Sequence, residues 1–600
     1  MGSRIQSAVL VLAGLSAIAA GYAQTGSGSG SKAKSNPVKQ PPAVASTYVG
    51  SEACSRCHLD IARHFAKTSM GRSLTRITPD YLKTLPIPAT YYDAKLDHHF
   101  DVYAENGKLY QSEYQTTAPG PNAGASASKE VFRNTHEMQW IVGTGENGFG
   151  ARLLRGDYLF QAPLSYYSRA AQWNLSPGYE NGDLGFNRAI VPGCIYCHSG
   201  RPRPVAGSVG KYENPVFTQT AVGCENCHGP GSAHVEAMGE GESYDKGKDP
   251  TIVNPTQIAS RLSDDICMSC HQVGDTRVLQ PGKTYQDFRP GTPLDRAVSI
   301  LMVPPTRENP PRDDHVEHYY SMILSKCYRA SANKAEAQQM RCTSCHDPHV
   351  EPTSAEAPAY FNGKCMSCHT VQSCKAPAAA RQQTTPADNC IGCHMPKRAG
   401  TVIAHTSLTN HRIVARPDEP YPDATFAMTT AALPDLIHID RVPGQSAAPP
   451  TITLLQAYEQ LKDHKTEYEA SYLKVISELE KTEPNNALVQ AALGHQALTS
   501  GRFEEAQQHL RQSLQLDPAQ SRVYADLSEL ADQQGHAEEA VSMARKAVML
   551  EPFSQPLQKA LISRLISAKQ YPEAIAAMEK YLDNFPEDDL IRKMLAIAKE

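Results

Sequence analysis

The pentapeptide Cys-Ser-Arg-Cys-His at residues 54–58 is the first of seven Cys-x-x-Cys-His motifs in a chain of 600 residues. With only 16 cysteines and 22 histidines in the chain, composition alone would not produce seven such motifs. The motif cysteines are Cys54, Cys57, Cys194, Cys197, Cys224, Cys227, Cys267, Cys270, Cys342, Cys345, Cys365, Cys368, Cys390 and Cys393. The histidines that follow them are His58, His198, His228, His271, His346, His369 and His394.

The spacing within each motif matches the chemistry of covalent haem attachment. Two cysteines three residues apart can each form a thioether with one vinyl group of a haem, and the next histidine reaches the iron. Structural zinc sites are the alternative, because paired cysteines also form half of a zinc tetrahedron. Zinc would not require a histidine after every second cysteine, so the sequence predicts seven covalently attached c-type haems, each with its iron.

Other histidines are candidates for the second axial position of each iron. His234 and His349 follow closely after motifs, and His405 and His411 come just after the last motif. An iron with both axial positions filled suits electron transfer, whereas an open position can bind a substrate. Further candidates are His136, His315 and His318.

Near the first motif, His64 and Met70 compete for the second axial position. A thioether ligand from Met70 would raise the reduction potential of that haem relative to two histidines. His98 and His99 alternate along an expected strand, so at most one of them is expected to serve as a ligand.

The first 23 residues have the pattern of an export signal, with Arg4 followed by an apolar stretch over 8–20 and a small-residue cleavage site at 21–23. The apolar stretch is short for a bilayer, and no later segment is apolar enough to span one. The net charge of −5 and the lack of a basic stripe argue against a nucleic-acid partner. We therefore expect an exported, periplasmic or extracellular protein that does not span a membrane.

Composition divides the rest of the chain. Residues 24–47 are rich in Gly, Ser and Pro and are typical of a flexible linker. Residues 48–416 hold the motifs and are predicted to form a seven-haem cytochrome domain with one short helix beside each motif. Only 40% of the chain is hydrophobic, so the haems are expected to supply much of the core.

Within this domain, a small β-rich insert is predicted at about residues 85–175. Asn106-Gly107 separates two alternating apolar segments, which is a strong hairpin signal, and Gly156-Asp157 is flanked in the same way. Two further cysteines, Cys327 and Cys374, lie outside the motifs, and in an oxidising compartment they can form a disulfide if they meet.

After a proline-containing linker at 417–452, the composition shifts to Ala, Leu, Glu and Gln. Four prolines recur 34 residues apart, at Pro484, Pro518, Pro552 and Pro586. This period predicts an α-solenoid of tetratricopeptide repeats over 453–600, with units from about 487, 521 and 555 and a degenerate unit near 453. An ordinary helical bundle is the alternative, but it has no cause to repeat at one period. The predicted fold is thus mainly α: a haem-cored cytochrome with a β-rich insert, then the solenoid.

Two stretches resemble multihaem c-type cytochromes of the cytochrome c-554 group. They are VGCENCHGPG at residues 222–231 and CTSCHDPH at 342–349, and residues 390–396 with the trailing histidines of 405–411 are similar. The chain resembles in particular bacterial members with a tetratricopeptide tail. The resemblance implies that His234 and His349 are distal ligands and that the protein is a periplasmic electron carrier. Related sequences often have a histidine ligand where this chain has Met70.

Three classes of function are compatible with these features. The favoured one is a cytochrome that relays electrons between redox partner proteins, with a protein docked on the concave face of the repeats. The alternative is an oxidoreductase with one open haem acting on a small nitrogen or sulfur compound, for which Arg133, His136 and Tyr166 are the candidate groups. A scaffold built on the repeats alone would not need seven redox centres. All seven motifs end in His, so nitrite reductases with a Cys-x-x-Cys-Lys haem are not matched, and no catalytic residue is predicted.

Overall fold

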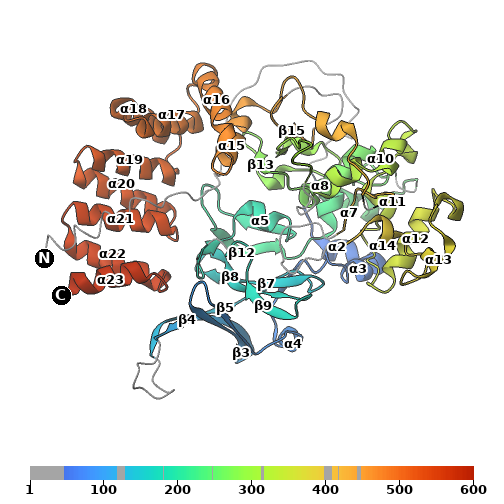
Figure 1. Cartoon of the computed structure of the whole chain (residues 1–600), viewed down its shortest axis with the longest axis horizontal. Coiled ribbons are helices and arrows are strands. Elements are labelled where there is room, and N and C mark those ends of the chain that lie inside the picture. Colours follow the sequence, from blue (N-terminus) through green and yellow to red (C-terminus); the bar gives the residue numbers. More distant parts are fainter. Residues whose placement is uncertain are drawn as a thin grey trace.

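The computed structural model describes residues 46–117, 129–179, 182–245, 248–311, 317–397, 409–416, 418–441 and 448–600. The predicted export signal, nearly all of the first linker, His315 and His405 lie outside these ranges. Figure 1 shows a stack of helices on one side, sheets in the centre and the short motif helices on the other side.

The central sheets come from the segment between the first two motifs. A four-stranded antiparallel sheet has the order β2-β3-β4-β5, and a six-stranded sheet has the order β1-β6-β7-β8-β10 with β9 paired to β8. Their bounds are β1 (Leu74–Arg76), β2 (Ala89–Asp93), β3 (His98–Glu105), β4 (Lys108–Thr116), β5 (Glu130–Met138), β6 (Trp140–Val142), β7 (Gly148–Arg155), β8 (Tyr158–Tyr167), β9 (Gln172–Leu175) and β10 (Arg188–Ala189). The strands therefore extend beyond the expected insert at both ends.

Both predicted hairpins are confirmed. β3 pairs with β4 across Asn106 and Gly107, which have φ angles of 50° and 74°, as a tight hairpin turn requires. β7 pairs with β8 across Gly156 and Asp157. Phe100, Leu109 and other apolar side chains of these strands form one buried cluster, so this region has a side-chain core of its own.

The first cysteine of each motif lies in a helix. In a helix, residues at positions i and i+3 share one face, so both cysteines of a motif can point to the same side. These helices are α2 (Ser51–Ser55), α5 (Pro192–Tyr196), α6 (Cys224–His228), α8 (Ser260–His271), α11 (Cys342–Cys345), α12 (Ala357–Met366) and α14 (Cys390–His394). The other helices of this half are α3 (Leu59–Phe65), α4 (Pro79–Leu82), α7 (Ser232–Gly239), α9 (His318–Ile323), α10 (Lys326–Ser331) and α13 (Ala378–Gln382). Its remaining strands are β11 (Arg201–Pro204), β12 (Tyr212–Gln219), β13 (Thr276–Leu279), β14 (Val298–Met302) and β15 (Ile437–His438).

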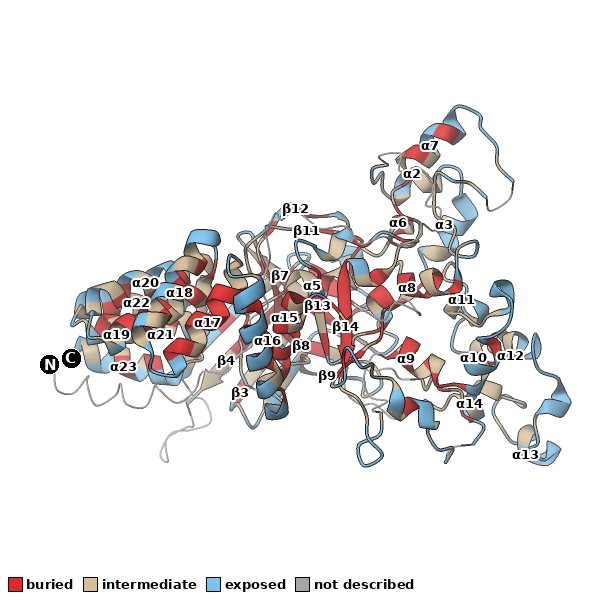
Figure 2. Ribbon diagram, turned by 90° about the horizontal axis from the view of Figure 1, so that it is seen from above, coloured by how far each residue is buried: buried red, intermediate tan, exposed pale blue. Residues whose placement is uncertain are grey.

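Burial is uneven across the motif half. Around β14 and α9, Leu294, Ile300 and Tyr320 belong to a buried apolar cluster. In contrast, Pro358 is the sole buried residue within the described segment 332–397, which holds three motifs. Figure 2 shows this contrast, with α12, α13 and α14 drawn mostly in the colours of exposed and intermediate residues.

The C-terminal helices stack in antiparallel pairs. They are α15 (Thr451–Lys462), α16 (Glu469–Thr482), α17 (Ala487–Thr499), α18 (Phe503–Leu516), α19 (Ser521–Gln533), α20 (Ala537–Leu550), α21 (Gln555–Ser567), α22 (Tyr571–Asn584) and α23 (Asp589–Lys599). α17, α19 and α21 begin at the predicted starts of the three units. A Cβ atom on Gly494 would lie 2.6 Å from Leu510, so glycine allows α17 and α18 to cross closely.

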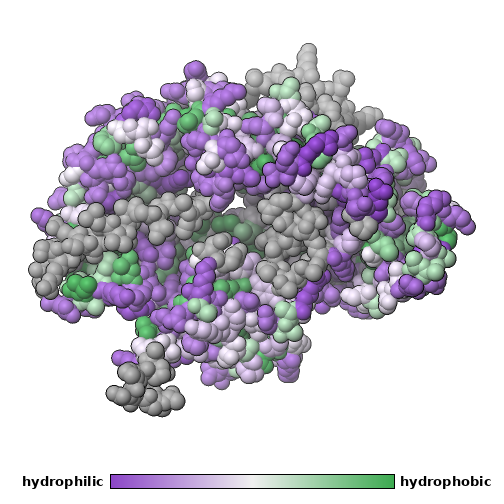
Figure 3. All heavy atoms as spheres, viewed as in Figure 1, coloured by the Kyte–Doolittle hydropathy of each residue, from purple (hydrophilic) through white to green (hydrophobic). Residues whose placement is uncertain are grey.

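The helical stack is joined to the rest of the chain at both ends. Side chains of α15 and α16 share a buried cluster with Val278 of β13 and Leu301 of β14. Near the other end, Asn187 Nδ2 donates to the Asn584 carbonyl at 2.6 Å, and the Phe553 ring packs on Phe160 at 4.9 Å between centroids. Within the described residues, no helix is long and apolar enough to cross a membrane. The face drawn in Figure 3 is mostly hydrophilic.

Candidate haem-binding centre

Three pairs of histidines have ring spacings that can be compared with those of two histidine ligands on one haem iron. An imidazole nitrogen binds a metal at about 2.0 Å and lies about 1.1 Å from the ring centroid, so two imidazoles on opposite sides of one iron have centroids about 6.2 Å apart. Each pair described below joins one motif histidine to one histidine outside the motifs. Their spacing therefore fits ligands on opposite faces of a haem.

The first pair joins the first motif to the segment after the third. The rings of His58 and His234 are nearly parallel, with centroids 6.2 Å apart and an interplanar angle of 20°. His234, on α7, donates from Nδ1 to Asp249 Oδ2 at 2.6 Å, which leaves Nε2 for a metal. Burial acts against ionisation of Asp249, but hydrogen bonds from Thr251 and His234 keep its pKa below the usual value.

The second pair joins the third motif to the segment after the fifth. The rings of His228 and His349 are nearly parallel, with centroids 6.0 Å apart and an interplanar angle of 15°. His228 Nδ1 donates to the Val253 carbonyl at 2.8 Å, and His349 Nδ1 lies 3.2 Å from Asp347 Oδ1. Both rings thus have Nδ1 engaged and Nε2 directed elsewhere.

The third pair joins the fifth motif to the segment after the seventh. The centroids of His346 and His411 are 6.3 Å apart, and His411 Nδ1 donates to the Thr409 carbonyl at 3.0 Å. His318 lies beside both His271 of the fourth motif, at 5.3 Å and 85°, and His411, at 4.5 Å. The 5.3 Å spacing is shorter than two ligands of one iron require.

The three pairs follow one rule along the chain. In each case the second histidine comes from the segment that follows the motif two places further on. The segment after one motif therefore lies beside an earlier motif, and the three pairs connect distant parts of the motif region.

The structure places the remaining predicted ligands as follows. His394 Nδ1 donates to the Val414 carbonyl at 2.7 Å, which matches the arrangement of the paired histidines. His198 follows α5, and His369 is exposed after α12. Met70 is half-buried after α3, and His64 is exposed on α3, while His234 is the residue whose ring lies nearly parallel to that of His58.

Three histidines of the sheets lie among non-motif residues. His136 packs on Phe186 at 4.7 Å, and burial together with Arg155 lowers the pKa of this histidine to about 4. His98 is buried and His99 lies between Tyr92 and Tyr114, so the two do point to opposite faces of β3.

The two other groups considered for an open-haem enzyme have structural contacts. Arg133 pairs with Glu130 and Asp101. Tyr166 packs against Phe149 and Trp173.

Cysteines of different motifs lie next to each other. The side chains of Cys54 and Cys224 interact, as do those of Cys197 and Cys270, and of Cys267 and Cys342. Weaker electrostatic contacts link Cys227 to Cys267, Cys345 to Cys368, and Cys365 to Cys390. The motifs therefore adjoin in the order 1-3-4-5-6-7, with motif 2 beside motif 4.

The two cysteines outside the motifs are both free. Cys327 lies near Cys368, whereas Cys374 lies near Cys390. The structure thus does not pair them with each other, because each lies beside a different motif.

Comparisons with known proteins found matches in the motif region and in the repeats. A family described as cytochrome c554 and c-prime matches residues 178–229, and a tetratricopeptide repeat family matches residues 497–565. Multiheme cytochrome MtrA of Shewanella baltica (strain OS185) is 24% identical over 231 residues, which cover 35% of this chain and 63% of that protein. These matches support a multihaem cytochrome with a tetratricopeptide-repeat region. They also imply covalently bound c-type haem with iron.

Two solved structures are similar to this chain, one over most of its length and one over about a quarter. The outer cell wall cytochrome OcwA has a TM-score of 0.40 at 15% identity and covers 87% of this chain and 99% of its own. A structure of MamA protein has a TM-score of 0.22 at 20% identity and covers 25% of this chain and 80% of its own. The chain thus matches 63% of the length of this curated relative, multiheme cytochrome MtrA.

The sequence did not point to the groups that orient these histidines. Asp249 and the carbonyls of Val253 and Val414 are 15 to 25 residues from the histidines they bond. Backbone carbonyls carry no residue-type signal, so only the carboxylate of Asp249 could have been suspected.

Proposed function

We propose that this protein is an exported electron carrier that holds seven c-type haems and relays electrons between redox partner proteins. The observation that carries the proposal is the set of three imidazole pairs with centroids 6.0 to 6.3 Å apart. Such pairs fill both axial positions of an iron, which favours electron transfer over substrate binding. A bound c-type haem would supply reversible one-electron chemistry at its iron.

The residues of the chain have distinct roles in this proposal. The motif cysteines hold each haem by thioethers, and the motif histidines serve as proximal ligands. His234, His349 and His411 are the distal ligands for the motifs of His58, His228 and His346. Acceptors at Nδ1 fix the orientation of these rings.

The order of the motifs supports a continuous route. Cysteines of motifs 1, 3, 4, 5, 6 and 7 adjoin in turn, so successive attachment points are neighbours. Motif 2 adjoins motif 4 and would form a side branch, which offers a second exit or entry point. The helices at one end of this route, α12 and α14, lie on the side of the molecule away from the repeats in Figure 1.

The repeats are proposed to dock a partner protein on their concave face. Tetratricopeptide repeats generally mediate protein interactions, and stacked helix pairs form an extended concave surface. His495 and Asp526 meet on this stack at 3.1 Å.

Low-temperature EPR of the oxidised, haem-loaded full chain tests the carrier against an open-haem enzyme. We expect only low-spin ferric signals from the wild type, because two imidazoles give a strong axial field. Replacing one distal ligand, His349→Ala, should convert one haem to a high-spin signal. The matched control is His509→Ala, since His509 bonds Gln490 within the repeats at 2.7 Å and lies away from the motifs.

Two outcomes would contradict the proposal. A high-spin signal of one haem in the wild type would favour an oxidoreductase with an open iron. An unchanged spectrum in the His349→Ala variant would show that this histidine is not a ligand.

A further inference from the structure

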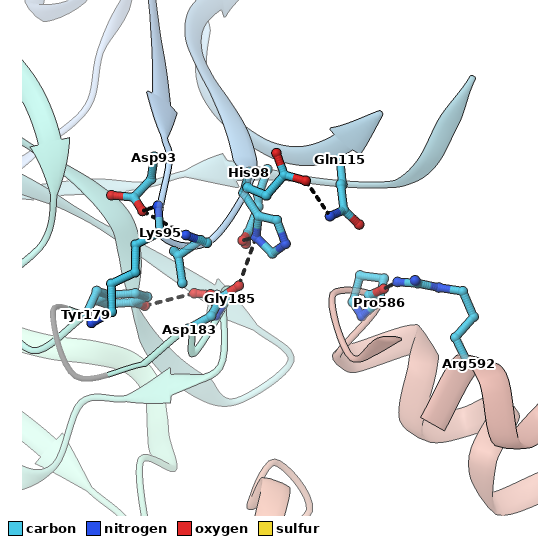
Figure 4. Close-up of polar contacts among 12 residues, drawn as sticks. Asp93, Lys95, His98, Gln115, Tyr179, Asp183, Gly185, Pro586 and Arg592 are labelled. Carbon is cyan, nitrogen blue, oxygen red and sulfur yellow. Dashed lines mark hydrogen bonds and ion pairs between the residues drawn. The ribbon is translucent and has the colours of Figure 1, made fainter. Parts of the chain in front are cut away.

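A buried histidine and several carboxylates meet where the four-stranded sheet faces the loop between α22 and α23. His98 Nδ1 lies 2.8 Å from Glu113 Oε1 and 3.0 Å from Asp183 Oδ2. One ligand-type atom from each of the three residues lies within 4.8 Å of the others. Figure 4 shows His98 and Asp183 directed towards each other, with Pro586 and Arg592 of the repeats nearby. This cluster takes no part in the proposed electron transfer.

Several buried carboxylate oxygens of the cluster accept no hydrogen bond from the described residues. The side chain of Glu113 is 0% exposed, and its Oε2 is buried without a hydrogen-bond partner among the described residues. Glu587, from the loop before α23, has both carboxylate oxygens buried and unpartnered in the same sense. Charge on Asp183 helps to raise the pKa of Glu587, so the two carboxylates are neighbours.

The turn after Asp183 is shaped to admit the carboxylate of Glu587. Gly185 N donates to Asp183 Oδ1 at 2.9 Å and so leaves Oδ2 to face His98. A Cβ atom on Gly185 would lie 3.1 Å from Glu587 Oε1, and the residue has a φ of +49°. Glycine is thus required both by the backbone and by the approach of the carboxylate.

Carboxylates outnumber basic groups in this cluster. Glu113, Asp183 and Glu587 lie around one imidazole, and Arg155 is the nearby basic side chain. Three buried carboxylates around one imidazole are costly unless protons or a metal ion compensate them.

We propose that His98, Glu113 and Asp183 bind a divalent first-row transition metal ion such as Zn²⁺, with Glu587 as the fourth ligand. One imidazole nitrogen and carboxylate oxygens are a donor set that Zn²⁺ accepts, whereas Ca²⁺ takes oxygen ligands only. Ligand atoms of a tetrahedral zinc site are about 3.3 Å apart, so the spacings of 2.8 and 3.0 Å at His98 Nδ1 need to widen by up to about half an ångström. Binding would displace the proton from His98 Nδ1 to solvent.

The ion would connect two parts of the chain that are far apart in sequence. Glu113 and His98 lie on adjacent strands, whereas Glu587 belongs to the loop that closes the last repeat. The contacts already present at this junction are modest, including Arg592 over Phe132 at 5.7 Å and the bond between Asn187 and Asn584. A bound ion would therefore fix the position of the terminal repeats against the sheet.

Zinc titration of the chelator-treated, haem-loaded full chain tests the proposal. Calorimetry with Zn²⁺ should show one tight site per chain that Ca²⁺ does not fill, and affinity should fall as the pH is lowered because His98 must lose its proton. The Glu113→Gln variant should weaken this site by roughly a hundredfold or more. The matched control is Asp101→Asn, a carboxylate on the neighbouring strand β3 that pairs with Arg133 at 3.4 Å.

Two further measurements test the same site if Glu113→Gln disturbs folding. Glu587→Gln removes the ligand on the loop and should also weaken binding. Zinc-edge X-ray absorption of the loaded wild type should show nitrogen and oxygen neighbours without sulfur. Equal zinc binding by the wild type and Glu113→Gln, or a sulfur neighbour that indicates the cysteine motifs, would overturn the proposal. The cluster would then be an imidazolium held by carboxylates that share protons.

Discussion

Residues 332–397 and residues 487–600 are both built from short helices, but their burial differs. The first segment holds three Cys-x-x-Cys-His motifs and buries only Pro358 among its described residues. The second buries an apolar side chain on every helix, including Leu510, Leu565 and Tyr581 at 0% exposure. The repeats are thus stabilised by side-chain packing, whereas the motif segment would need packing from the haems proposed to bind its cysteines.

The largest expected effect comes from blocking one haem attachment in the poorly buried segment. In the double variant Cys365→Ala with Cys368→Ala, we expect trypsin to cut residues 332–397 roughly tenfold faster or more, while the repeats stay intact. The reason is that this segment has no side-chain core to replace the contacts of the lost haem. Limited proteolysis followed by mass spectrometry measures both cleavage rates in one sample.

The same experiment has a control within the chain. Cys327→Ala with Cys374→Ala also removes two cysteines near these motifs, but neither belongs to a motif. This variant should be digested at the wild-type rate. If the motif variant were equally resistant, the segment would be stable without that haem and the comparison would fail.

A smaller effect is expected from a cavity in the repeats. Leu510 is fully buried against Gly494 where α17 and α18 cross, so Leu510→Ala should destabilise the repeats by about 2–5 kcal/mol. Thermal unfolding followed by helical circular dichroism, with haem absorbance recorded in parallel, separates the two regions. The repeats should melt earlier while the haem absorbance transition is unchanged.

Met549→Ala is the matched control for this cavity. Met549 lies on α20 with 80% of its surface exposed, so its truncation removes almost no buried area. A comparable loss of stability in both variants would mean that burial in the repeats does not determine their stability.

Features with a local signal could be predicted from the sequence. The starts of α17, α19 and α21 were predicted because four prolines recur at a fixed period of 34 residues. The turn at Asn106-Gly107 was predicted because this dipeptide adopts the positive φ angles that the hairpin needs. His234, His349 and His411 were selected for their closeness to motifs in sequence, and the structure places each beside a motif histidine.

Contacts between distant segments could not be predicted. His411 pairs with His346, 65 positions earlier, although His394 is much closer in sequence. The cluster of His98, Glu113 and Asp183 was missed because three segments contribute one residue each. The only sequence signal was Glu113, a charged residue on a strand that pairs with apolar Phe100. His136 was selected as a ligand candidate by residue type alone, and it packs among side chains of the sheets.

The smallest predicted effect uses His136 to extend the comparison to the sheets, where side chains form the core. Burial and Arg155 lower the pKa of this histidine to about 4, against about 6.5 in the unfolded chain. Between these values the unfolded chain binds the proton and the folded chain does not, so stability falls as the pH falls from 6.5 towards 4. Going from pH 7 to pH 5 should therefore cost about 2 kcal/mol. Denaturant unfolding followed by fluorescence of Trp140 and Trp173 reports on this region. The His136→Gln variant should lose this part of the pH dependence because its amide does not titrate, and an undiminished dependence in that variant would show that another group is responsible.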